Sequence, residues 1–211
     1  YLIKSEPPVV IAPTLSGSVT GIIAPKDRLI TGKDLQAGDH IIAVASSGIH
    51  SNGVSLVIKK ALELPEKFLT KLPSGITLGE SALIPTRSYV KLIESLQEAQ
   101  VKVHALLPGT GDGVGKLSFD KRPFTYRVQS WLAVPELMLY FKNNGLPMLD
   151  CLKTFNWGAG YYIFAPKDQV DQIIKIGTAA GYTLADVGIV EHGTRQTIFE
   201  PGNIVFPPPG Q

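Results

Sequence analysis

The residues best suited to chemistry lie in one short polar turn, between an apolar run and an amphipathic segment. Residues 41–45 are apolar and predict a buried strand, and residues 55–62 predict a helix. Between them, His50, Ser51 and Asn52 stand among small residues. The start of a helix offers unpaired backbone N–H groups that favour an anion. The pattern predicts a ligand site, and the alternative is that Ser51 or Asn52 caps the helix while His50 is merely exposed.

A second group with chemical potential is the segment Pro85-Thr86-Arg87-Ser88-Tyr89-Val90-Lys91. Apolar residues at helical spacing predict a long helix over residues 86–99, with Thr86 as its cap. Arg87 would then lie in the first turn, where the helix dipole disfavours a cation. An anionic ligand such as a phosphate would explain a cation there, and the alternative is an ordinary surface arginine.

A glycine-rich loop forms the third group. Glycines alternate with other residues from Gly109 to Gly115, which suits a backbone that wraps around an anion. The loop is not a Walker A sequence, because Thr110 stands where the first glycine belongs and Leu117 follows Lys116. Nor does it match the dinucleotide fingerprint, so it does not identify a cofactor. The alternative is a plain flexible loop.

The fourth group centres on Asn156, which lies between bulky rings and small residues just before an expected strand at residues 161–164. Its amide could hold a ligand or could satisfy a neighbouring loop.

Composition and spacing exclude several other classes of function. The net charge of +2, without a stripe of basic residues, argues against nucleic acid binding. No apolar run has the length of a membrane-spanning helix. The four histidines lack the paired spacing of metal ligands, so we expect no metal site. The single cysteine, Cys151, cannot form an internal disulfide and reads as a small buried residue in a reducing compartment.

The elements that must position these groups alternate along the chain, which predicts an α/β (α+β layered) domain with a mixed sheet and packed helices. The expected strands are 41–45, 101–106, 124–128, 161–164 and 185–190, the last being the final core strand. The expected helices are 55–62, 81–84, 86–99, 135–144 (ending at Gly145) and 169–180. Extended segments are also expected at residues 9–12 and 18–24, and an unstructured tail at residues 207–209.

Taken in order, these motifs resemble one family, the phosphoribosylformylglycinamidine cyclo-ligases, also called aminoimidazole ribonucleotide synthetases. The family's turn, Ala-Ser-Ser-Gly-x-His-Ser-Asn-Gly-x-Ser-Leu-Val, is matched by residues 45–57. Its Pro-Thr-Arg-x-Tyr-Val-Lys is matched by residues 85–91, and its Phe-Asn-x-Gly-x-Gly by residues 155–160. The resemblance covers about residues 15–200 and points to the family's C-terminal part.

The resemblance implies an ATP- and Mg²⁺-dependent ligase that closes formylglycinamidine ribonucleotide into aminoimidazole ribonucleotide in purine synthesis. It implies a small ribonucleotide substrate, a homodimer when full length, a cytoplasmic location, and no nucleic acid or membrane partner. His50 and Asn52 become candidate catalytic residues, with His50 able to shuttle a proton. The candidate substrate contacts are Ser47, Gly48, Ser51, Gly53, Thr86, Arg87, His104, Gly109, Thr110, Gly111 and Asn156.

Two departures from the family pattern affect these expectations. The acidic metal ligands and nucleotide loops of the family's N-terminal half are missing, so residues 1–30 read as the end of that ATP-binding domain and residues 31–211 as the C-terminal domain. We therefore expect the ATP and Mg²⁺ sites mainly outside this chain. The family's His-Ile-Thr-Gly-Gly-Gly is also altered here, where His104 precedes the glycine loop. A related ATP-using enzyme (selenophosphate synthetase, thiamine monophosphate kinase or a hydrogenase-maturation protein) or a non-catalytic binding protein of this fold is the alternative.

Overall fold

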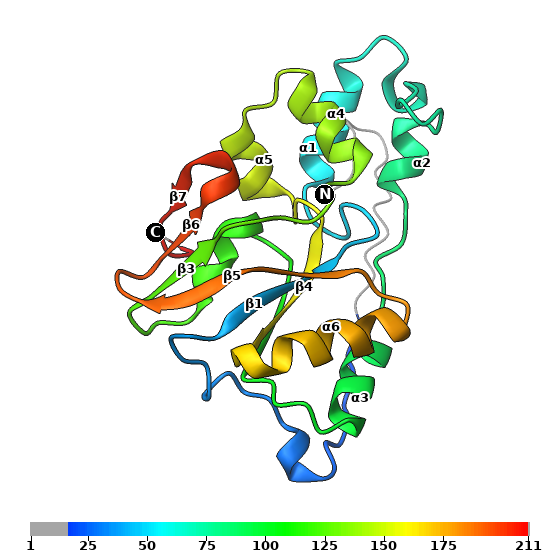
Figure 1. Ribbon diagram of the computed structural model, residues 1–211. Helices are drawn as coiled ribbons and strands as arrows, with labels where there is room; N and C mark the ends of the chain where they lie inside the picture. Colours follow the sequence, from blue (N-terminus) through cyan, green and yellow to red (C-terminus); the bar gives the residue numbers. More distant parts are fainter. Residues whose placement is uncertain (1–16, 211) are drawn as a thin grey trace.

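A mixed β-sheet separates two layers of helices in the computed structural model, which describes residues 17–210 (Figure 1). Within those residues the sheet has seven strands in the order β2-β4-β1-β5-β3-β6-β7. Only β3 and β6 pair in parallel; the other neighbours are antiparallel. The strands are β1 His40–Ala45, β2 Ala105–Pro108, β3 Phe124–Val128, β4 Ala159–Ala165, β5 Leu184–His192, β6 Gln196–Phe199 and β7 Ile204–Phe206.

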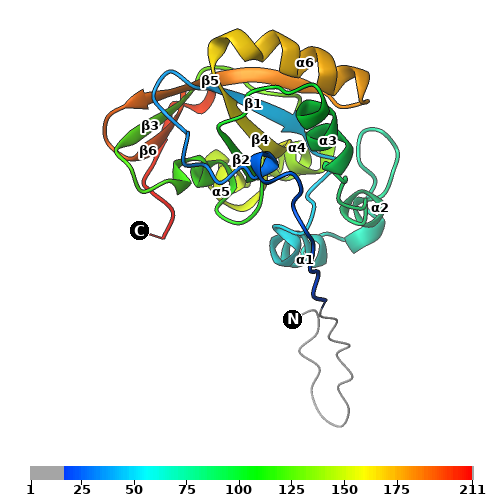
Figure 2. The same cartoon turned by 90° about the horizontal axis from the view of Figure 1, so that it is seen from below.

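Helices cover both faces of the sheet, which explains why β1 is apolar from Ile41 to Ala45. Helices α3 (Val90–Glu98) and α6 (Val170–Ala179) pack on the face that carries Ile42 and Val44. The opposite face carries Ile41 and Ala43 and packs against the other helical layer, so that α6 and α1 lie on opposite sides of the sheet (Figure 2). That layer holds α1 (Val54–Leu62), α2 (Leu78–Ala82), α4 (Glu136–Asn143), α5 (Met148–Thr154) and the 3₁₀ segment Gly113–Phe119. Successive side chains of a strand point to opposite faces, so a strand buried on both faces must be apolar at every position.

Most of the expected elements are confirmed. The predicted layered α/β fold is correct, as are the strands near 41–45, 124–128, 161–164 and 185–190 and the helices near 55–62, 135–144 and 169–180. The strand expected at 101–106 lies at Ala105–Pro108 instead. Cys151 is a fully buried free thiol, and burial raises its pKa to about 11, which suits a packing residue rather than a nucleophile.

The long helix expected over residues 86–99 is wrong at its start. Helix α3 begins only at Val90, Tyr89 occupies the cap position, and no side chain caps it. Residues 84–89 form neither helix nor strand, so Thr86 is not a cap and Arg87 does not lie in a first helical turn. The short helix expected at 81–84 begins earlier, at Leu78, where Thr77 and Glu80 form a capping box.

Three elements were not predicted from the sequence: strands β6 and β7, which follow the expected last strand, and helix α5. Strands β6 and β7 continue the sheet beyond β3, and their Phe199 and Phe206 are buried. The ring of Phe199 meets Trp131 edge to face at 5.1 Å. Strands this short carry little alternation, so packing and not local pattern defines them. Helix α5 spans only seven residues and is likewise too short for a clear helical period.

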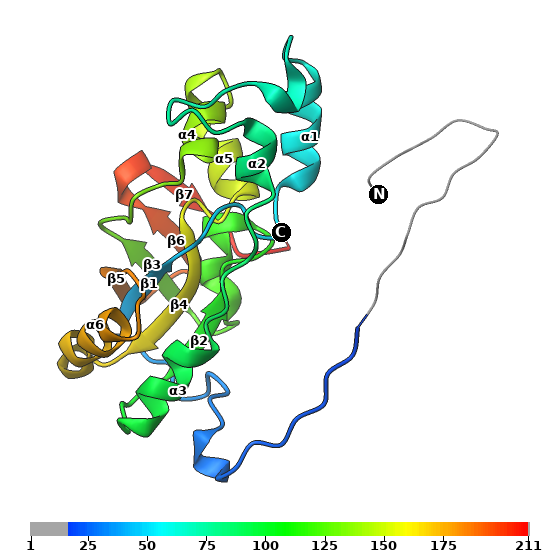
Figure 3. The same cartoon turned by 90° about the vertical axis from the view of Figure 1, so that its right-hand side faces the viewer.

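The extended segment expected at residues 18–24 is not a strand. Residues 17–25 run away from the sheet (Figure 3), and Val19 and Ile22 are 98% and 95% exposed. A strand needs a neighbour for its backbone hydrogen bonds, and none pairs with this segment among residues 17–210. The segment expected at residues 9–12 lies outside the described residues. Within the described part, no helix is long and apolar enough to span a bilayer.

Candidate functional site

The motifs at residues 45–57, 85–91 and 155–160 meet at one end of β1 and β4. Ser47, in the turn after β1, donates through Oγ to the carbonyl of Pro85 at 2.7 Å. The same Oγ accepts the backbone N–H of Arg87 at 3.1 Å. One hydroxyl therefore joins the turn at residues 46–53 to the irregular segment at residues 84–89. The Ser47 side chain thus already has two partners within the protein.

Asn156 joins the same turn to the start of β4. It is fully buried, and its Oδ1 accepts from the Gly158 N–H at 2.9 Å and from Ser46 Oγ at 3.2 Å. Its Nδ2 donates to the carbonyl of Gly48 at 2.8 Å. The amide thus satisfies neighbouring backbone, as one of the two sequence-based interpretations had it, and Asn156 acts as a positioning residue in this structure.

His50 lies in the same turn, and its ring is half-buried. Its backbone is left-handed (φ +55°), an uncommon conformation for a residue with a side chain, which often marks a functional site. Its Nε2 accepts the N–H of Ser47 at 3.1 Å. That bond requires the lone pair on Nε2 and so assigns the hydrogen of the neutral ring to Nδ1. Burial lowers the pKa of His50 below its ordinary value, which keeps the ring neutral.

Gly160 gives the His50 ring its space. A Cβ at this position of β4 would lie 2.4 Å from His50 Cε1 and 1.9 Å from the hydroxyl oxygen of Tyr89. Only a residue without a side chain lets these two rings approach the strand. The Tyr89 hydroxyl donates to the carbonyl of Ala45 at 3.0 Å, and its ring stacks on Tyr161 at 5.1 Å. Sequence reasoning assigned Tyr89 only a packing role, although it lies inside the Pro-Thr-Arg-x-Tyr motif.

The glycine loop lies beside the same point of β4. The N–H of Gly109 donates to the carbonyl of Gly160 at 3.0 Å. The next residue, Thr110, accepts a hydrogen bond at its hydroxyl from the ammonium group of Lys116. Gly111 is exposed. Because Gly160 contacts the His50 ring, the loop and the histidine share one neighbourhood.

The remaining turn residues have different surroundings. Gly53 begins α1 in a left-handed conformation (φ +80°), with no side-chain cap, so the alternative in which Ser51 or Asn52 caps the helix is wrong. A Cβ on Gly53 would lie 2.6 Å from the ring of Phe155. Ser51 is exposed and Asn52 is half-buried.

Arg87 is bound to the protein rather than left free. Its guanidinium donates to the carbonyl of Gly181 and lies over the ring of Tyr182, with 4.4 Å from Cζ to the ring centroid. Both partners belong to the turn between α6 and β5. Thr86, beside it, is exposed.

His104 lies away from this neighbourhood. Its backbone N–H bonds Phe164 at one end of the β2–β4 pairing, whereas Gly109 bonds Gly160 at the other. The four residues of β2 lie between His104 and Gly109, so the two positions are five steps apart, a span of about 16 Å at roughly 3.3 Å per step. The buried His104 ring contacts the Asp39 carboxylate, with 2.9 Å from Nδ1 to both oxygens.

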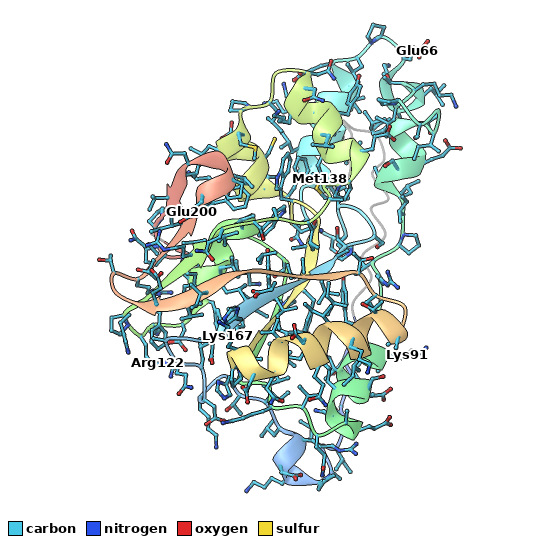
Figure 4. All side chains as sticks on the ribbon, viewed as in Figure 1. Glu66, Lys91, Arg122, Met138, Lys167 and Glu200 are labelled. Atoms are coloured by element: carbon cyan, nitrogen blue, oxygen red, sulfur yellow. The ribbon has the colours of Figure 1, made fainter. Side chains whose placement is uncertain are left out.

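A second arginine, Arg122, is also bound by the protein and lies away from the candidate site. Its guanidinium donates to the carbonyls of Gly32 and Leu35, in the loop before β1. Figure 4 shows Arg122 at the opposite side of the molecule from Lys91, which ends the Pro-Thr-Arg motif.

The described residues do not form a multidentate metal site. No three histidine, cysteine, aspartate or glutamate side chains gather anywhere in residues 17–210.

The site belongs to a known class of domain. Residues 36–115, which contain the turn, the Pro-Thr-Arg motif and the glycine loop, match the family described as AIR synthase related protein, C-terminal domain. The fold agrees, since the chain superposes on a thiamine-monophosphate kinase from Stenotrophomonas maltophilia K279a with a TM-score of 0.57. That match has 17% identity and covers 85% of this chain and 55% of the kinase.

In sequence the chain is similar to the phosphoribosylformylglycinamidine cyclo-ligases, the family that the motifs indicated. It is 36% identical over 168 residues to the enzyme of that name from Methanocaldococcus jannaschii, a match that covers 77% of this chain and 47% of the relative. It is also 36% identical over 201 residues to that of Lactobacillus delbrueckii subsp. bulgaricus, covering 90% of this chain and 57% of the relative. The chain therefore spans about half the length of these relatives.

Proposed function

We propose that this chain is the C-terminal part of an enzyme that closes formylglycinamidine ribonucleotide into aminoimidazole ribonucleotide with consumption of ATP. The observation that carries the proposal is the convergence of the three family motifs on one point. Ser47 and Asn156 bind the turn at residues 46–53 to the segment at residues 84–89 and to the start of β4. The likeness in sequence to cyclo-ligases supports this reaction over that of the thiamine-monophosphate kinase, with which the chain shares the fold.

The reaction needs the formyl oxygen to be converted into a leaving group and the amidine nitrogen to attack the formyl carbon. ATP supplies the phosphoryl group for the first step, and phosphate leaves in the second. The protein must hold the two reacting ends together and stabilise the charge that develops on oxygen.

In this mechanism His50 acts as a neutral hydrogen-bond donor. Its Nε2 already accepts the Ser47 N–H, and its Nδ1 has no partner among residues 17–210 and is not sealed from solvent. Nδ1–H is thus the ring atom available to an anionic oxygen of the substrate. Proton uptake at Nε2 would set two N–H groups against each other, so this geometry favours donation from Nδ1 over the proton shuttle expected from the sequence.

The other expectations belong to the same proposal. ATP and Mg²⁺ would be held mainly by parts of the enzyme outside this chain, and the glycine loop and Asn52 would contact the ribonucleotide. The homodimer and the cytoplasmic location stay predictions, as does the assignment of residues 1–30 to the preceding domain.

The test is an assay of the full-length gene product with formylglycinamidine ribonucleotide, ATP and MgCl₂. The product is an aromatic amine that can be diazotised and coupled to a dye. We expect product with the wild type and at least a roughly tenfold lower kcat with H50F, which keeps a flat ring without the Nδ1–H. H50Q, which retains a donor, should lie between them. A folded, ATP-binding protein that forms no product, but phosphorylates thiamine monophosphate, would overturn the proposal.

A further inference from the structure

The ammonium group of Lys116 has no anionic partner among the residues that the structure describes. Lys116 is half-buried, and its Nζ donates to the hydroxyl of Thr110. Among residues 17–210, no carboxylate lies within 4.0 Å of it, whereas Lys60 pairs with Glu63 at 2.8 Å. Of the two acidic residues nearest in sequence, Asp112 is exposed and makes no ion pair with it, and Asp120 pairs with Arg122 instead. A partly desolvated cation without a counter-charge is unfavourable unless an anion joins it.

Thr110 places this cation at the edge of the candidate site. It follows Gly109, whose N–H bonds the carbonyl of Gly160, and Gly160 in turn contacts the His50 ring. Gly111, the next loop residue, is exposed, and a side chain there would meet no heavy atom within 4 Å of its Cβ, so the loop is open on that side. A ligand near His50 can reach both the ammonium and the hydroxyl.

Arg87 is the competing cation, and the protein already uses it. Its guanidinium donates to the carbonyl of Gly181 and stacks on Tyr182. To bind a phosphate it would have to leave one or both partners. Lys116 need not leave its partner to bind a phosphate, because the Thr110 hydroxyl is a weak, neutral partner that can bind the same anion beside the ammonium group.

We propose that Lys116, with the hydroxyl of Thr110, binds the phosphate group of the ribonucleotide substrate, and that Arg87 has a structural role. This assignment rests on the proposed function for the identity of the ligand, a sugar monophosphate. It goes beyond the sequence pattern, which assigned no role to Lys116 and in which Arg87 and the glycine loop were the expected phosphate contacts.

The experiment uses the full-length protein and ribose 5-phosphate as the probe, with calorimetry to measure the dissociation constant. Loss of a charge-assisted hydrogen bond corresponds to a roughly 10- to 100-fold weaker Kd, which we expect for K116M and for the similarly sized K116Q. K116R should recover most of the affinity, and R87M should change it less than about threefold. Neutral ribose, titrated in parallel, should bind K116M and the wild type equally.

Three results would overturn the assignment: no binding of ribose 5-phosphate to the wild type, unchanged affinity in both K116M and K116Q, or a larger loss in R87M than in K116M. Circular dichroism of each variant shows whether it is folded, and K116Q provides the answer if K116M is not. The cyclisation assay separates the two proposals. If ribose 5-phosphate binding depends on Lys116 but no product forms, the phosphate site is supported and the proposed reaction is refuted. If K116Q forms product with an unchanged KM, the reaction is supported and the phosphate site is refuted.

Discussion

Replacing Asn156 by Asp changes one atom of the framework that holds the candidate site. The wild-type amide donates to the carbonyl of Gly48 at 2.8 Å and accepts from the N–H of Gly158 at 2.9 Å. An ionised carboxylate keeps the acceptor but sets a negative oxygen against the Gly48 carbonyl in a fully buried position. A protonated carboxyl can still donate to that carbonyl. The folded state of N156D should therefore favour the protonated form, and its pKa should rise.

The size of the effect follows from linkage. An unfolded aspartate has a pKa of about 3.9, and burial of this kind raises the folded pKa by about 3. Between about pH 4 and 7 the folded variant then holds a proton that the unfolded chain has lost, so its stability falls as the pH rises. At about 1.4 kcal/mol per pH unit, the loss relative to the wild type reaches about 4 kcal/mol at pH 7 and is less than about 1 kcal/mol at pH 4.

Urea denaturation of the wild type, N156D and N156A at several pH values between about 4 and 7.5 tests this. N156A loses all three hydrogen bonds at every pH, so it should be destabilised by about 3 kcal/mol without a slope relative to the wild type. The m-values should agree, so that the midpoints report stability. A profile for N156D parallel to that of the wild type would refute the reasoning, because the new carboxylate would then be solvated or the Gly48 bond unimportant.

Three further predictions concern the same end of the sheet. G160A places a methyl group 2.4 Å from His50 Cε1 and should lower kcat in the cyclisation assay at least roughly tenfold while circular dichroism stays unchanged; full activity would contradict the close approach. The His50 ring should titrate below its ordinary pKa of 6.5 and carry its hydrogen on Nδ1 in ¹⁵N-edited NMR, and, since the unfolded chain takes up that proton first, stability should fall as the pH drops through the window just below 6.5. An Nε2-protonated ring would refute the Ser47 bond. R87M should lower the free energy of unfolding, measured in urea, by about 1–2 kcal/mol, because it removes the hydrogen bond to Gly181 and the stacking on Tyr182. An unchanged free energy of unfolding would mean that Arg87 makes neither contact in solution.

Local residue patterns were enough to define the fold class and the position of the main turn. A strand buried on both faces has to be apolar throughout, so the run of residues 41–45 predicts such a strand from the sequence alone. Helix α4 ends before Gly145 because a left-handed residue (φ +95°) follows it, and that too is a local signal. The motif spacing was enough to indicate the cyclo-ligase family, because it depends on residue types and not on their contacts.

Which polar residues face a ligand and which face the protein became apparent only from the packed chain. Arg87 and His104 have the chemistry of ligand contacts, but one lies on Tyr182 and the other against Asp39, both far away along the chain. Lys116 is the opposite case, because it was not expected to contact a ligand and yet no carboxylate within residues 17–210 pairs with it. That follows from the packing of the whole loop and not from its neighbours in sequence. Hydrogen-bond partners and desolvation are set by long-range contacts, and a single sequence records only the local ones.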